Sequence, residues 1–113
     1  MTLHRDPRGE ALAEFFRREA GAVSLSADVT GQVHLVHVGL ALLDAATLAQ
    51  DLAVDDPVLV QLSEAGCFES MPGDRARFVS TAEIHRALLR PISGTAEVGE
   101  DILRSVVTAA GQP

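Results

Sequence analysis

An aspartate followed by proline occurs twice in this chain of 113 residues, and each occurrence marks the start of a segment. In Asp6-Pro7 and in Asp55-Asp56-Pro57, an aspartate that is a good helix N-cap precedes a proline. Proline is tolerated in the first turn of a helix but not in its interior. The two pairs predict a first helix of about 13 residues that ends at Gly21 and a short helix over 57–65 that ends at Gly66. The apolar run that opens the second segment would also suit a buried strand, so both assignments stay open there.

Two hairpins are predicted from alternation and turn residues. From Ala22 the apolar side chains recur with a period of two, and a return segment over 33–40 is rich in β-branched residues. Gly31 lies at the turn between them, so residues 22–40 are predicted to form an antiparallel hairpin. The Pro72-Gly73 step predicts a second hairpin, whose strands include Cys67 to Ser70 and Arg75 to Ser80.

Three further helices complete the predicted order. Asp44 is a candidate N-cap for a helix that ends near Val54. Ser80 and Glu83 have the spacing of a capping box and open a helix over 81–90, and Thr95 caps a last helix over 96–110. The resulting order, α-β-β-α-α-β-β-α-α, lacks a strand-helix-strand period and predicts a single α+β domain over 1–113. Residues 1–5 and 111–113 are expected to be frayed ends.

Composition narrows the class of protein. Hydrophobic residues make up 47% of the chain and charged residues 22%, which excludes disorder over most of its length. No apolar run approaches the roughly 18 residues of a membrane-spanning helix, and the N-terminus lacks the apolar stretch of a signal peptide. We therefore expect a cytoplasmic protein that does not contact a membrane.

The charges are distributed unevenly. All nine basic residues are arginines, and none lies between Arg18 and Arg75, whereas that interval holds nine of the sixteen acidic residues. A surface of one sign attracts partners of the other sign, so we expect an acidic docking surface for a basic protein. Solubility alone, or mimicry of nucleic-acid charge, would also account for the acidic residues. The candidate partner-binding residues are Asp44, Asp51, Asp55, Asp56, Glu64 and Glu69.

Candidates for catalysis or metal binding are few. Cys67 is the only cysteine, which excludes an internal disulfide, and the acidic residues near it disfavour a reactive thiolate. His34 and His37 are the only close histidine pair, and on a strand they would point to opposite faces. We therefore predict no metal site and no cofactor. A small enzyme using His34, His37 or Cys67 remains an alternative function.

Part of the chain resembles a known family of regulators. Residues 48–54, the segment Leu62-Ser63-Glu64-Ala65-Gly66-Cys67-Phe68 and the predicted hairpin over 71–78 are similar to the helix-helix-wing portion of winged-helix transcription regulators. The resemblance covers about 30 residues and implies DNA binding, with 57–65 as recognition helix and Arg75 and Arg77 near phosphates. The recognition helix would differ from the family's pattern, because it contains Glu64 and no basic residue.

Adjacent apolar pairs predict self-association. Pairs such as Leu42-Leu43 and Val106-Val107 widen the apolar stripes beyond the needs of one small core, so helices 81–90 and 96–110 are expected to pack against a second copy in a homodimer. The leading function hypothesis is a non-catalytic interaction module, an adaptor, chaperone-like or inhibitory protein, with an acidic surface for a basic partner. Winged-helix DNA binding is the alternative.

Overall fold

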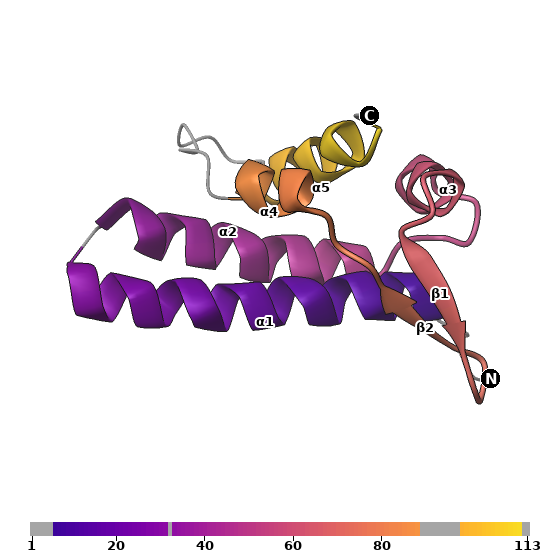
Figure 1. Ribbon diagram of the computed structural model, residues 1–113, viewed down its shortest axis with the longest axis horizontal. Coiled ribbons are helices and arrows are strands. Elements are labelled where there is room, and N and C mark those ends of the chain that lie inside the picture. Colours follow the sequence, from indigo (N-terminus) through magenta and orange to yellow (C-terminus); the bar gives the residue numbers. More distant parts are fainter. Residues whose placement is uncertain (1–5, 32, 89–97, 112–113) are drawn as a thin grey trace.

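The computed structural model describes residues 6–31, 33–88 and 98–111. It consists of five helices and one two-stranded antiparallel sheet (Figure 1), which confirms the α+β class. In chain order the elements are α1 (Pro7–Thr30), α2 (Val33–Gln50), α3 (Pro57–Glu64), β1 (Phe68–Met71), β2 (Arg75–Phe78), α4 (Ala82–Leu88) and α5 (Val98–Ala110). The predicted end of the helix over 81–90, the predicted cap Thr95, and the ends 1–5 and 112–113 lie outside the described residues.

Both aspartate-proline steps begin helices, as predicted. The Asp6 carboxylate accepts a hydrogen bond of 2.8 Å from the backbone N–H of Arg8 in the first turn of α1. Asp56 does the same for Val58 at the start of α3, with a distance of 2.9 Å. Gly66, at φ 79°, follows the end of α3 in the left-handed conformation that favours glycine. The segment over 57–65 is therefore a helix, and the strand alternative is wrong.

The hairpin predicted over 22–40 is wrong, because α1 continues to Thr30 and α2 begins at Val33. Of the alternating residues, Val23 extends the buried stripe of α1 that contains Phe16 and Ala20, whereas Leu25 and Val29 are exposed. Gly21 does not end the helix, because α1 continues through it and it does not adopt the positive φ of a glycine helix stop. The turn predicted at Gly31 is present, at φ 69°, but it joins two helices.

Two predicted helix starts are also corrected. Asp44 lies inside α2, which is already helical from Val33, so it caps no helix of its own. In α4 the cap is Thr81, whose hydroxyl accepts from the N–H of Ile84 at 3.2 Å. Ser80 instead hydrogen bonds to His85, 2.8 Å away. Ser80 and Thr81 are adjacent, and either hydroxyl could cap α4. Because Ser80 contacts His85, Thr81 is the cap.

The hairpin predicted around Pro72-Gly73 is confirmed. β1 pairs antiparallel with β2, and Phe68 lies opposite Phe78. Gly73 and Asp74 both have positive φ, at 79° and 55°, in the tight turn between the strands. The Phe68 and Phe78 rings meet edge to face, and Phe78 also packs on Phe15 of α1. These aromatic contacts join the hairpin to the helical body.

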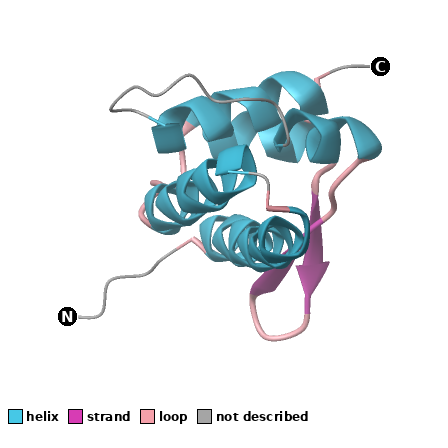
Figure 2. Ribbon diagram, turned by 90° about the vertical axis from the view of Figure 1, so that its left-hand side faces the viewer, coloured by secondary structure: helices cyan, strands magenta, loops and turns pink. Residues whose placement is uncertain are grey.

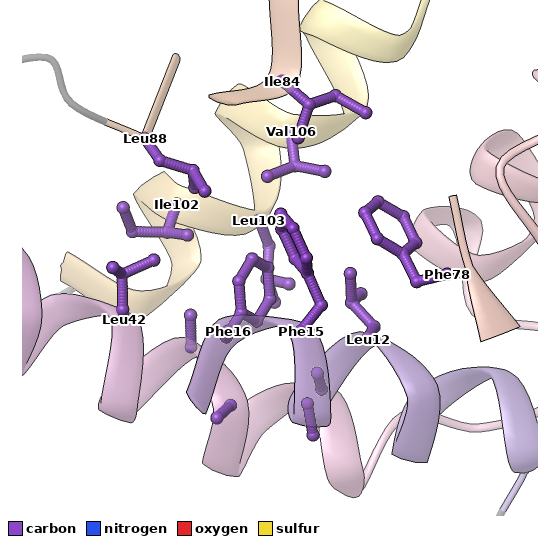
Figure 3. Packing of buried hydrophobic residues seen from close by; sticks show 14 of the residues in the cluster. Leu12, Phe15, Phe16, Leu42, Phe78, Ile84, Leu88, Ile102, Leu103 and Val106 are labelled. Atoms are coloured by element: carbon purple, nitrogen blue, oxygen red, sulfur yellow. The ribbon is translucent and has the colours of Figure 1, made fainter. Parts of the chain in front are cut away.

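The elements pack as an antiparallel pair, α1 and α2, with α4 and α5 on one side of it (Figures 1 and 2). Glycine and alanine permit the close approach of the pair: a Cβ at Gly9 would lie 2.6 Å from the carbonyl oxygen of Ala49. The core lies between this pair, β2 and the C-terminal helices (Figure 3). Its largest fully buried side chains include Phe16, Leu12, Leu42, Ile84, Leu88 and Val106.

Candidate interaction surfaces

An arginine clamp organises the end of the molecule where α1 begins. Arg8 donates to both carboxylate oxygens of Asp6, to the carbonyl oxygen of Val54 at 2.7 Å and to the hydroxyl of Ser63 at 2.8 Å. One side chain therefore joins the start of α1, the connection over 51–56 and the end of α3. The hydrogen bonds from Arg8 lower the pKa of Asp6, although partial burial opposes the shift.

Acidic side chains gather around this clamp. Asp51, Asp55 and Glu64 are exposed, and none of them has an ion pair within the described residues. Glu10 and Glu14 of α1 line a groove of about 400 Å³ with Arg17 and Gln50, at the other edge of the same end. We call Glu10, Glu14, Asp51, Asp55, Asp56 and Glu64 the acidic end. In this groove Arg17 lies beside Glu10 and Glu14 and donates to the side-chain oxygen of Gln50, while Arg8 is paired with Asp6.

The other predicted partner-binding residues hold structural partners within the chain. Asp44 accepts a hydrogen bond of 3.0 Å from the backbone N–H of Gly99, at the start of α5. Glu69 forms an ion pair of 2.7 Å with Arg77 across the hairpin. Asp56 lies at the acidic end, but its carboxylate is occupied by capping α3. Three of the six residues thus hold structural partners, and three present free carboxylates.

Sequence reasoning missed Glu10 and Glu14. These residues precede the interval without arginine, and four arginines surround them in the sequence. The signal that could have found them is their spacing of four residues, which places both on one exposed face of α1. Their position next to the connection over 51–56 depends on how α1 and α2 pack.

An open groove of about 520 Å³ adjoins the acidic end. It lies between the hairpin, the start of α1 and the connection over 51–56, and both Arg8 and Arg75 line it. Exposed apolar side chains border it: Val54 is 69% exposed and Met71 is 38% exposed. Apolar side chains with charges around them are typical of protein interfaces.

The arginines of the winged-helix interpretation lie together on β2. Arg75 and Arg77 are both exposed, and the alternation of a strand places them on one face of the hairpin. The Glu69 carboxylate already neutralises Arg77, and Arg75 donates to the carbonyl oxygen of Pro72 at 3.2 Å. The exposed side chains of α3 include Glu64 and no arginine, so this helix would repel phosphates.

The sequence candidates for nucleophilic or metal chemistry are Cys67, His34 and His37. Cys67 is 3% exposed, and burial raises the pKa of its thiol, which disfavours the reactive thiolate. The prediction that His34 and His37 lie on a strand is wrong, because both belong to α2, and the His37 side chain is exposed. In the part of the chain that the structure describes, no three His, Cys, Asp or Glu side chains form a metal-binding group.

A serine, a histidine and a glutamate meet where α4 packs on α1. His85 Nε2 lies 2.8 Å from Ser80 Oγ, and its Nδ1 lies 3.6 Å from a carboxylate oxygen of Glu19. The ring also packs edge-on against Phe15. A catalytic relay needs a hydrogen bond between the acid and the histidine, and 3.6 Å is too long for one. The arrangement therefore supports the packing of α4 on α1 rather than activation of Ser80.

The opposite end of the molecule carries exposed apolar side chains. We call residues 22–30 of α1 and 33–43 of α2 the apolar arm; it projects past α4 and α5 in Figure 1. Its exposed large side chains are Leu25 (68%), Val29 (86%), Val36 (48%), Leu40 (60%) and Leu43 (48%). Asp28 is the one Asp, Glu, Lys or Arg in residues 22–43. The acidic end and the apolar arm therefore differ in chemistry as well as in position.

Comparisons with family models, curated proteins and solved structures give no match to this chain. Within the described ranges, no helix has both the length and the apolar character needed to cross a membrane.

Proposed function

We propose that the protein is a non-catalytic interaction module, an adaptor, chaperone-like or inhibitory protein, whose acidic end binds a basic surface of a partner protein. The observation that carries the proposal is the group formed by Asp51, Asp55 and Glu64, three exposed carboxylates without ion pairs in the described part of the chain. Carboxylates without internal partners keep their full charge for an external cation, and they steer a basic partner during its approach.

Nearby apolar side chains support a protein as the partner. Val54 lies beside two of these aspartates in the connection over 51–56, and Val60 of α3 is 38% exposed. An apolar contact surrounded by charges gives affinity through burial and specificity through charge. Each exposed pair across such an interface contributes about 0.3–1 kcal/mol, so three carboxylates account for roughly a tenfold change in affinity.

The test compares two variants that remove equal charge from different surfaces. One carries Asp51→Asn, Asp55→Asn and Glu64→Gln at the acidic end, and retains Asp56 because it caps α3. The control carries Asp28→Asn, Glu83→Gln and Glu100→Gln, which are exposed positions away from the acidic end. Both changes take the net charge from −7 to −4, since three negative charges are removed in each.

The tagged wild type and both variants are used in pull-downs from nuclease-treated native lysate, washed at low and moderate salt. We expect a stoichiometric protein that the wild type and the control variant retain, that the acidic-end variant binds about tenfold more weakly, and that salt displaces. Equal retention by both variants would refute docking through the acidic end. Recovery of DNA alone, from a sample without nuclease treatment, would favour the arginines of β2 instead.

A further inference from the structure

We propose that the apolar arm is a self-association surface, on which a second copy of the chain packs with its α2 antiparallel to the first. This inference concerns a different surface from the acidic end and goes beyond the proposed function. It places the homodimer expected from the sequence on α1 and α2 instead of on the C-terminal helices.

The exposed residues of α2 form a helix-packing seam. Val36, Leu40 and Leu43 are separated by four and then three residues, the alternation by which one helix packs along another. The opposite face of α2, which includes Val38 and Ala45, is buried in the core, so the described part of one copy leaves the seam uncovered. A seam with this spacing fits an identical helix as well as any other partner helix.

The exposed area reaches the lower limit of a specific interface. Leu25 and Val29 of α1 are exposed in the part of the arm where the two helices approach, since a Cβ at Gly39 would lie 3.4 Å from Ser24 Oγ. With the three α2 residues they expose on the order of 500 Å² of apolar surface per copy, and therefore about 1,000 Å² for two copies, the lower bound of a specific interface. The apolar faces of α4 and α5 are instead buried: Ile84, Leu88, Ile102 and Val106 are each at most 3% exposed.

The charge distribution favours a second copy as the partner and an antiparallel orientation of the two α2 helices. Each chain has a net charge of −7, and 24 of its 25 charged residues lie outside 22–43, since Asp28 is the exception. The arm is therefore a surface on which two copies meet with little repulsion. In a parallel pair the two acidic ends would lie side by side, whereas the antiparallel pair places them at opposite ends.

Sedimentation equilibrium over a hundredfold concentration range tests the inference on three full-length proteins. The wild type should change from one to two copies as concentration rises. Leu40→Glu, which places a charge on both sides of the seam, should weaken association by about 100-fold or more. Thr108→Glu, an exposed position of α5 outside both surfaces, should associate like the wild type. Circular dichroism checks that each variant keeps its helices, which is expected because both positions are exposed.

Cysteine cross-linking tests the orientation. In a Cys67→Ser background, Val36→Cys and Leu43→Cys chains should form disulfides when mixed, because a two-fold axis beside Leu40, the centre of the seam, places one position opposite the other. Neither variant should cross-link efficiently alone. Cross-links of each variant with itself would overturn the antiparallel orientation. A wild type that stays monomeric at every concentration, or a dimer that Leu40→Glu does not weaken, would overturn the self-association surface, and neither result bears on the acidic end.

Discussion

Gly9 and Gly21 of α1 offer a direct test of how the helical pair packs, because the same substitution should act in opposite directions. At Gly21 nothing lies within 4 Å of an added Cβ, so Gly21→Ala gains helix propensity at no steric cost. We expect it to stabilise the protein by about 1 kcal/mol. At Gly9 an added Cβ would lie 2.6 Å from the Ala49 carbonyl oxygen, which is backbone and cannot rotate away.

Gly9→Ala should therefore destabilise the protein. Relieving the contact requires α1 and α2 to separate, and overpacking of this kind costs roughly 1–3 kcal/mol, which exceeds the gain in propensity. The net effect is a loss of about 1–2 kcal/mol and a decrease in Tm of roughly 4–8 °C, against an increase of about 4 °C for Gly21→Ala. Because the chain has no tryptophan or tyrosine, unfolding is followed by circular dichroism. Stabilisation of both variants would refute the close approach of the two helices.

Three further predictions follow from individual contacts. Asp44→Ala removes the acceptor of the Gly99 N–H, so stability should fall by about 1 kcal/mol and the Gly99 amide should exchange faster; unchanged exchange would contradict this contact. Arg8 lowers the pKa of Asp6, so this pair stabilises the fold above about pH 4 and loses its effect as the pH falls through the lowered pKa. Asp6→Asn, which keeps an N-cap, should lower stability by about 1 kcal/mol at pH 7 and by much less at pH 2; a constant difference between urea midpoints would argue against the pair. Cys67 should react with a thiol reagent at least about 100-fold more slowly in the native protein than in urea, and rapid native labelling would show that it is not buried.

Several features follow from local sequence alone. Asp6 and Asp56 cap helices because an aspartate before a proline satisfies the free N–H groups of the first turn whatever the rest of the fold does. Gly66 and Gly73 adopt positive φ because few other residues do so without strain. These interactions span two to four residues, so their outcome does not depend on distant contacts.

The region 22–40 required the tertiary structure. Its apolar residues satisfy a strand period and a helix period at once, and packing against the rest of the chain selected the helix: Val23 and Val38 are buried, while Leu25, Val29 and Leu40 are exposed. A strand would have placed Val23 and Leu25 on the same buried face. The exposed apolar arm is thus a consequence of the helical assignment.

The same distinction between local sequence and tertiary structure applies to the candidate interaction surface. The sequence determined that the middle of the chain is acidic, because the number of acidic residues does not depend on the fold. It could not show which carboxylates are free. Asp44 is separated by 55 residues from its partner Gly99, and Glu69 by eight from Arg77, so only the folded chain assigns them structural roles. The tertiary structure also brought Glu10 and Glu14 to the acidic end, because helix packing places side chains together that no local pattern connects.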